Sequence, residues 1–346
     1  MVLGGCLHPD AEAFFLSKPG RRTVTASSFE DGDERAGMIK ANTAEVVSYQ
    51  PPTTKSLNAY ARRITAKAKR LIGRAAAAPL TWMGAETRAE ALENLTERMQ
   101  VTIETPRGSI RYYAPTPLLL ARGKNMLLKE MDTIRWIDGF PGSCVFWDVG
   151  ANVGVYSLYA ATKRGVSVLS FEPLAANFHA LSRNVELNRL GEQITGYCLA
   201  LSGATELGVL NMDSSAMGSA LSQFGRPGEI SRYCTRKEDS GCTHGMIGYS
   251  VDDFINQFHP SFPNYIKMDV DGLEWKILQG ARKTVCDSRL RSLLVELTLS
   301  DQREHDLAVA FLGDFGFGLV SVGDVQGTEA GKAANHLFER RSDASR

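Results

Sequence analysis

The sequence has few of the features that build a disulfide framework or a metal site. Its six cysteines are scattered and include no CxxC pair. This spacing argues against a disulfide scaffold and a zinc site, so we expect reduced thiols and no bound metal. Cys234 and Cys242, near His244, come nearest to a metal-binding group. On a polar loop such proximity is more often incidental.

Neither charge of one sign nor hydrophobicity is in excess. The 39 lysines and arginines balance the 39 aspartates and glutamates, which gives no reason to expect a nucleic-acid partner. No run reaches the roughly 18 apolar residues that cross a bilayer. The first residues, MVLGGCLHPD, lack the basic start of a secretory signal, so we expect a cytoplasmic location.

The N-terminal part differs in composition from the rest. Residues 1–55 are rich in Ser, Thr, Gly and charge without a steady period, which predicts a flexible arm. Residues 56–78 contain six basic side chains, no acid and a thin apolar stripe at helical spacing. A helix of this kind packs on the main domain or lies on an anionic membrane surface. We expect helices and a hairpin over 56–142, as a lid or shoulder ahead of a domain at 143–346.

From residue 143 onward, apolar strand segments alternate with helical segments. The strands are predicted at CVFWD, VSVLSFEP, ITGYCLALS, YIKMDV and RSLLVELTL, and GLVSV with NHLFERR forms a final antiparallel pair. Such alternation predicts an α/β fold with a doubly wound parallel sheet and helices on both faces. The polar stretch 213–249 is expected to be a long loop on the acceptor side.

The segment FWDVGANVGVYS passes from the first strand into a helix. Ligands of open parallel sheets bind at the carboxyl ends of strands, and glycines there admit a ligand to the backbone. The spacing of Asp148, Gly150, Asn152 and Gly154 lacks the third glycine of a dinucleotide site. We therefore expect a ligand without phosphates, whose amine meets Asp148 and whose carboxylate meets the loop amides.

Glu172 ends the second strand, 24 residues beyond Asp148. An acid at this place commonly receives ribose hydroxyls in doubly wound folds. A nucleoside with an amino-acid tail indicates S-adenosylmethionine. The alternative is that Glu172 only caps the following helix.

Several blocks together resemble the FkbM family of S-adenosylmethionine-dependent methyltransferases. They are VFWDVGANVGVYSLYAA, SFEPLAANFHALSRNVELN, YIKMDVDGLEWKILQGA, LLVEL, KEMDTIRWID and NHLFERR, within residues 100 to 340. The resemblance implies a class I methyltransferase fold, Rossmann-like, with strand order 3-2-1-4-5-7-6 and an antiparallel last strand. It also implies methyl transfer to a hydroxyl of a sugar, polysaccharide or polyketide-type product. The predicted cofactor site is completed by Ala151, Pro173 and Leu201.

Two acids, Asp269 and Asp271, follow the fourth strand and are predicted to act on the acceptor. One of them would remove the hydroxyl proton, and mutual repulsion would raise the pKa of one carboxyl. A magnesium ion on this pair is an alternative, with Glu296 as a third ligand. Glu274 is predicted to cap its helix.

The preferred function is therefore an O-methyltransferase. The alternative from another class is a non-catalytic module that binds the cofactor and docks to a membrane or partner through residues 56–78. A nicotinamide oxidoreductase is disfavoured by the missing glycine pattern. The sequence does not identify the acceptor or the oligomeric state.

Overall fold

The computed structural model describes residues 71, 73–212, 214–226, 243–328 and 331–341. The chain divides into two compact units, Met1–Ala76 and Ala77–Arg346, and the helices and strands named below lie in the second. The predicted arm and most of the predicted basic helix lie outside the described residues. The domain boundaries that we placed at residues 55 and 142 stay predictions.

A helix, a hairpin and two further helices precede the main sheet. They are α2 (Ala85–Glu97), β1 (Gln100–Thr105), β2 (Gly108–Tyr113), α3 (Pro117–Lys124) and α4 (Met131–Asp138). The hairpin lies within the predicted range, and Gly108 has the positive φ of 113° that the tight turn requires. The helix α3 begins at Pro117, and Thr116 caps it by accepting from the amide of Leu119.

The hairpin is fixed to helix α6 (Ala175–Asn188). The amide of Tyr113 donates to Asn184 Oδ1 at 2.7 Å, and that of Arg111 donates to Asn188 Oδ1 at 2.8 Å. Asn184 is fully buried. Because buried amide groups cost free energy when unpaired, these bonds hold the hairpin against the main domain.

The main sheet has the predicted topology. Along the chain its strands are β3 (Cys144–Val149), β4 (Val166–Phe171), β5 (Ile194–Tyr197), β10 (Tyr265–Met268), β11 (Ser292–Thr298), β12 (Phe317–Val322) and β14 (Gly331–Arg340), with β13 (Gln326–Thr328) beside β14. Their spatial order is β12-β14-β11-β10-β3-β4-β5, and β14 runs antiparallel to both neighbours. Numbered in chain order, this is 3-2-1-4-5-7-6, so the predicted class I methyltransferase fold is confirmed.

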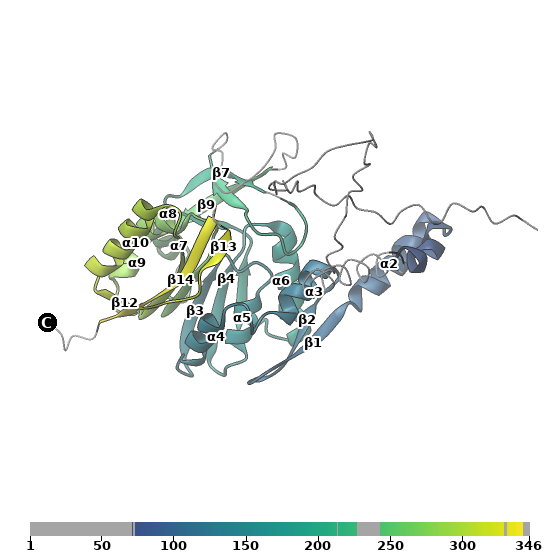
Figure 1. The fold of residues 1–346 in the computed structure, drawn as a ribbon, viewed down its shortest axis with the longest axis horizontal. Helices are drawn as coiled ribbons and strands as arrows, with labels where there is room; N and C mark the ends of the chain where they lie inside the picture. Colours follow the sequence, from purple (N-terminus) through teal and green to yellow (C-terminus); the bar gives the residue numbers. More distant parts are fainter. Residues whose placement is uncertain (1–70, 72, 213, 227–242, 329–330, 342–346) are drawn as a thin grey trace, which may run out of the picture. The chain divides into compact units, whose positions relative to one another are not determined.

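Helices cover both faces of this sheet (Figure 1). They include α5 (Val155–Ala161), α7 (Val251–Phe258), α8 (Glu274–Gln279), α9 (Arg282–Cys286) and α10 (Gln302–Asp314). Successive residues of β3 enter different cores: Phe146 packs with Leu158 of α5, and Trp147 packs with Phe254 of α7. Strands buried on both faces read as continuous apolar runs, which is why the sequence located them well.

A second, smaller sheet lies where we expected mostly loop. Its strands β6 (Ala200–Ser202), β9 (Thr243–Ser250), β7 (Glu206–Asn211) and β8 (Gln223–Gly225) are neighbours in that order. Part of the predicted loop at 213–249 is therefore strand. The segment ITGYCLALS, predicted as one strand, splits into β5 and β6, which belong to different sheets. The alternation of apolar and polar residues along the chain looks the same in either sheet. Only the tertiary structure shows that β5 and β6 belong to different sheets.

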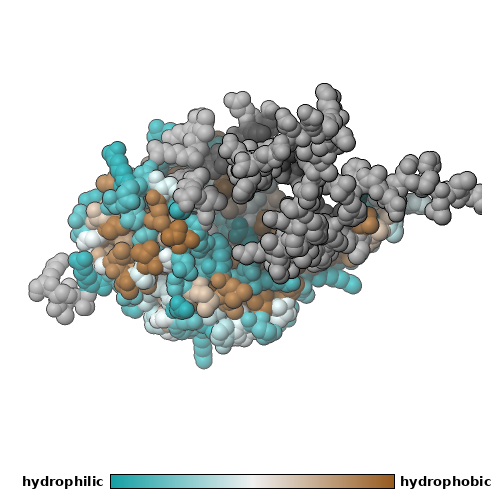
Figure 2. Space-filling model, viewed as in Figure 1, coloured by the Kyte–Doolittle hydropathy of each residue, from teal (hydrophilic) through white to brown (hydrophobic). Residues whose placement is uncertain are grey.

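The described surface mixes hydrophobic and hydrophilic residues, as Figure 2 shows. None of the described helices combines the length and the apolar character that a membrane span requires.

Candidate active site

The glycine loop after β3 is a tight, fully bonded turn. Gly150 has a φ of 83°, and a Cβ there would lie 1.9 Å from the carbonyl oxygen of Asp269. The amides of Gly150 and Ala151 both donate to the carbonyl of Phe171, at 2.9 and 3.0 Å. These amides are occupied, so the expectation that they hold a ligand carboxylate needs correcting. The glycine instead lets the ends of β3 and β10 approach closely.

Glu172 lies at the end of β4 and faces the loop. Its Oε2 accepts from the amide of Asn152 at 2.8 Å, and its Oε1 accepts from the amide of Leu174 at 2.8 Å and more weakly from Asn177 at 3.4 Å. Burial raises the pKa of Glu172 to about 7, although these bonds oppose the shift. The bond to Leu174 also caps α6, so the capping role and a ligand role are compatible.

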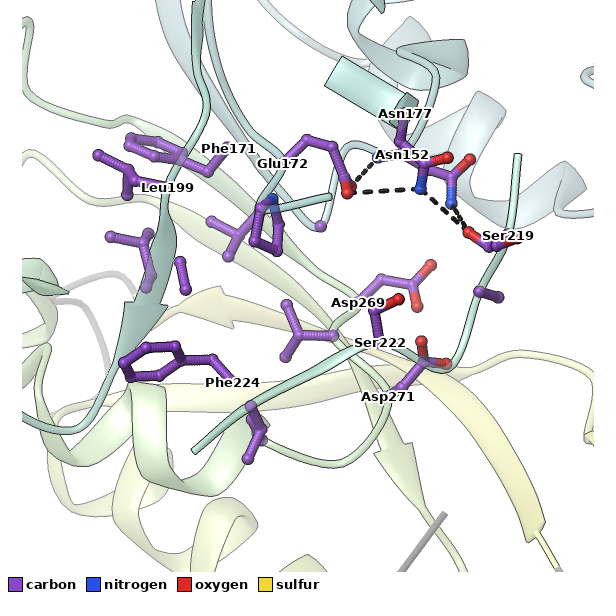
Figure 3. Close-up of a pocket in the computed structure, with 18 residues that line it drawn as sticks. Asn152, Phe171, Glu172, Asn177, Leu199, Ser219, Ser222, Phe224, Asp269 and Asp271 are labelled. Carbon is purple, nitrogen blue, oxygen red and sulfur yellow. Dashed lines mark hydrogen bonds between the residues drawn. The ribbon is translucent and has the colours of Figure 1, made fainter. Parts of the chain in front are cut away.

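A pocket opens between the ends of β3, β4 and β10. Figure 3 shows Glu172, Asn152 and Asn177 on one side, Ser219 and Ser222 facing them, and Asp269 between Glu172 and Asp271. The predicted residues that line it are Gly150, Asn152, Glu172, Pro173, Leu201, Asp269 and Asp271. Phe171, Leu199 and Phe224 add an apolar wall.

Three predicted cofactor residues do not line this pocket. Ala151 lines a neighbouring cavity instead. Gly154 begins α5 with a φ of 82° and packs on Leu181. Asp148 is 1% exposed and accepts from Ser157 Oγ at 2.5 Å, while its Oδ1 has no partner. Burial raises the pKa of Asp148, with Lys267 opposing the shift. Asp148 therefore lies beneath the loop.

The loop that contains Ser219 closes over the pocket. The side-chain amides of Asn152 and Asn177 both donate to the Ser219 carbonyl, at 2.8 and 3.0 Å, and Asn177 also accepts from the Gly218 amide at 2.7 Å. The amide of Leu221 donates to Asp271 Oδ2 at 2.7 Å. The pocket has a free volume of about 60 Å³ in this closed arrangement. Small-molecule sites usually have roughly 300–1,000 Å³, so this free volume is smaller than that of a typical ligand site.

The two predicted catalytic acids occupy different places. Asp269 lines both the pocket and the neighbouring cavity, whereas Asp271 lines the pocket alone. Burial and the nearby Asp269 raise the pKa of Asp271 to about 6. Burial would raise the pKa of Asp269 too, but the ammonium of Lys267, 2.7 Å from Oδ2, outweighs it and lowers that pKa.

A buried polar cluster surrounds Asp269. Lys267 is 1% exposed, lies 3.9 Å from Glu130 Oε2, and has its ammonium 4.8 Å from the ring centre of Tyr156. Burial would lower the pKa of Lys267, but Asp269 and Glu130 outweigh it and raise that pKa, so the ammonium stays charged. Glu296 shares a hydrogen bond with Asp269, and that neighbour together with burial raises the pKa of Glu296 to about 9.

This cluster gives no support to the magnesium alternative. The described part of the chain contains no group of three or more His, Cys, Asp or Glu side chains arranged to hold a metal ion. Glu274 accepts from the amides of Val270 and Gly272, at 3.0 and 3.2 Å, and so stabilises the turn that enters α8. No side-chain hydrogen bond caps α8 itself, so the predicted capping role of Glu274 stays a prediction.

Sequence reasoning missed Lys267, Glu130, Tyr156 and Asn177. The signal for Lys267 was present, because a lone lysine inside the apolar strand YIKM is a charge that must be paired when the strand is buried. Glu130 is the residue just before α4, and its partner Asn335 is 205 positions away. No local pattern reports such a contact.

Comparison with known proteins agrees with this geometry. Residues 148–319 match the family model of the methyltransferase FkbM domain. The chain carries an FkbM methyltransferase domain. The predicted family is thereby confirmed for this part of the chain.

The domain is similar to several characterised proteins. It is 27% identical over 152 residues to the hexuronic acid methyltransferase AglP of Haloferax volcanii, covering 44% of this chain and 56% of that protein. It is 26% identical over 212 residues to the 31-O-demethyl-FK506 methyltransferase FkbM of Streptomyces tacrolimicus, covering 56% and 80%. A crystal structure of methyltransferase FkbM from Methylobacillus flagellatus KT is 19% identical with a TM-score of 0.38, covering 58% of this chain and 44% of that one. The match thus spans about half the length of the Haloferax relative and of the Methylobacillus structure.

Proposed function

We propose that this protein transfers the methyl group of S-adenosylmethionine to a hydroxyl of a sugar, polysaccharide or polyketide-like product. The observation that carries the proposal is the buried carboxyl of Glu172, which lines the pocket beside the glycine loop. Relatives named for a hexuronic acid and for a polyketide-type acceptor support the substrate class.

The pocket suits a nucleoside that carries an amine and hydroxyls. The buried oxygens Asn152 Oδ1 and Ser222 Oγ line the pocket without a hydrogen-bond partner, and Asp148 Oδ1 lies unpaired nearby. Such atoms are costly when unpaired, and donor groups of a ligand would satisfy them. Phe171, Leu199 and Leu201 provide the apolar surface that an adenine ring needs.

Asp269 is the residue we propose to act on the acceptor, because it lies where the two cavities join. When bound, the cofactor supplies an electrophilic methyl group on a sulfonium. Asp269 would hold the acceptor hydroxyl and take its proton, while the bound cofactor would supply the methyl group and leave as the neutral thioether. Lys267 keeps that carboxyl ionised and oriented. We propose that Asp271 chiefly holds the closing loop through the amide of Leu221.

Two measurements test this function. Calorimetry with S-adenosylhomocysteine should give one site per chain. Transfer from a labelled donor should follow over a panel of glycans and polyketide-type alcohols. Failure to bind S-adenosylhomocysteine at any pH between 6 and 9 would defeat the proposal. Binding without transfer to any acceptor would favour the non-catalytic alternative.

A further inference from the structure

A larger cavity lies beside the cofactor pocket. It has a free volume of about 340 Å³ and shares Gly150, Asn152 and Asp269 with the pocket. Its other walls include Leu118, Arg122, Met126, Lys129, Tyr156 and Lys267. This volume is near the lower end of the roughly 300–1,000 Å³ typical of small-molecule sites. It therefore suits one ring of an acceptor better than a long chain.

The inner end of the cavity carries the acidic groups. Asp269 and Glu130 line it there, together with Lys267, which is paired with both. A hydroxyl can donate to a carboxylate and accept from an ammonium at the same place. This end therefore suits the hydroxyl that receives the methyl group.

The outer wall is basic. No acid occurs between Glu104 and Glu130, whereas Arg122 and Lys129 stand on the helix α3 and the turn that follows it. The Nε of Arg122 donates to the Gly218 carbonyl at 2.7 Å, and its guanidinium also acts electrostatically on Asp271. The Lys129 side chain is 56% exposed and has Glu130 as its ion-pair partner, at 3.2 Å.

The cavity lining thus contains three cations, Arg122, Lys129 and Lys267, against two carboxylates, Glu130 and Asp269. Lys267 pairs with Asp269 and Lys129 pairs with Glu130, so the surplus of one positive charge in this lining falls to Arg122 on the outer wall. An acceptor that completes this arrangement places an anionic group on the outer wall and a hydroxyl at Asp269. Planar carboxylates and tetrahedral phosphates or sulfates both accept from an arginine in this way.

We propose that this cavity is the acceptor site and that it selects an anionic saccharide, whose negative group is held by Arg122 and Lys129. The proposal rests on the methyltransferase function proposed above and names its substrate class. The negative group is held at the wall away from Asp269, so the product is a methyl ether with its anionic group intact.

The test compares matched acceptors and matched variants. Glucuronic acid-terminated and glucose-terminated oligosaccharides of equal length are the acceptors, with a phosphorylated oligosaccharide as a third arm. Arg122→Gln and Lys129→Gln remove the wall charges one at a time. Lys124→Gln is the control, because Lys124 is an exposed residue of the same helix that does not line the cavity.

The wild type should use the glucuronate or the phosphate acceptor with a KM at least tenfold below that of the glucose acceptor. Each wall variant should raise that KM by roughly ten- to hundredfold, as expected for one charge-assisted contact, with little change in kcat. The KM for the glucose acceptor should stay unchanged in every variant, and Lys124→Gln should behave as wild type. The product should resist mild alkali, which cleaves a methyl ester and spares an ether.

Equal KM values for the charged and neutral acceptors would overturn the anionic-acceptor proposal, as would an alkali-labile product. Comparing the KM values of the glucuronate and phosphate acceptors shows whether the site prefers a carboxylate or a phosphate. Titration of each variant with S-adenosylhomocysteine keeps the two proposals apart. Normal cofactor binding with no charge preference refutes the acceptor assignment alone, whereas absent cofactor binding refutes the proposed function. Unchanged thermal unfolding of Lys129→Gln ensures that at least one variant reports on binding.

Discussion

Replacing Glu172 by glutamine should weaken cofactor binding by an amount that the hydrogen bonds set. Each carboxylate oxygen can accept two hydrogen bonds. Oε1 already accepts from Leu174 and Asn177, and Oε2 accepts from Asn152, so one strong position remains, on Oε2. A ribose hydroxyl bonded there contributes on the order of 1.5–3 kcal/mol, as for other charge-assisted bonds. The substitution should therefore raise the Kd for S-adenosylhomocysteine about 10- to 150-fold.

The pH of the binding assay matters, because the Glu172 carboxyl titrates near neutral pH. Because burial raises the pKa of Glu172 to about 7, a substantial fraction is protonated at neutral pH, and binding to the ionised form is lost as the pH falls through 7. Calorimetry at pH 8.5 measures the full effect. At pH 6 the wild type should release protons on binding, seen as a dependence of the heat on the buffer, and Glu172→Gln should not.

The matched control is Glu186→Gln on the exposed side of the helix α6 that follows Glu172, where the Glu186 carboxylate pairs with Arg183. It should leave the Kd unchanged. Glu172→Gln should also lose stability, since its amide cannot accept from both Asn152 and Leu174, and one unpaired amide costs about 1–3 kcal/mol. A Kd within threefold of wild type in a folded variant, or proton release that persists, would refute a role for Glu172 in holding the ribose.

Three further predictions follow from the same geometry. Asp269→Asn should lower kcat by about 10²–10⁴ with the Kd for S-adenosylhomocysteine kept within threefold. Asp271→Asn should chiefly raise the KM for the cofactor. If Asp271→Asn lowered kcat more than Asp269→Asn does, the roles assigned to the two residues would have to be exchanged. Gly150→Ala forces a Cβ against the Asp269 carbonyl, so this variant should not fold stably when measured by urea unfolding. Gly313→Ala has open space around it and should raise the free energy of unfolding by about 0.5–1 kcal/mol. Lys267→Met should cost about 3–5 kcal/mol in urea unfolding because it leaves buried carboxylates unpaired, and a loss below 1 kcal/mol would contradict that pairing.

Sequence pattern alone determined the main sheet and many of the residues that line the proposed cofactor pocket. Central parallel strands are buried on both faces, so they appear as continuous apolar runs, and the glycines and acids at their carboxyl ends mark the ligand edge. Gly150, Glu172 and Asp269 could be identified because each follows directly from its position at the end of such a strand. The prediction failed for the loop amides, because the sequence does not show that the carbonyl of Phe171 already occupies them.

Only the tertiary structure decided which charges meet. Lys267 is paired with Glu130, 137 positions earlier in the chain (267 − 130), and the loop at Ser219 reaches back to Asn152 and Asn177. Periodicity reports which face of an element is buried, but it carries no information about the partner that a buried polar group finds across the fold. The proposed acceptor cavity is the clearest case, because α3, α5 and β10 each supply one wall and none of these segments alone suggests a site.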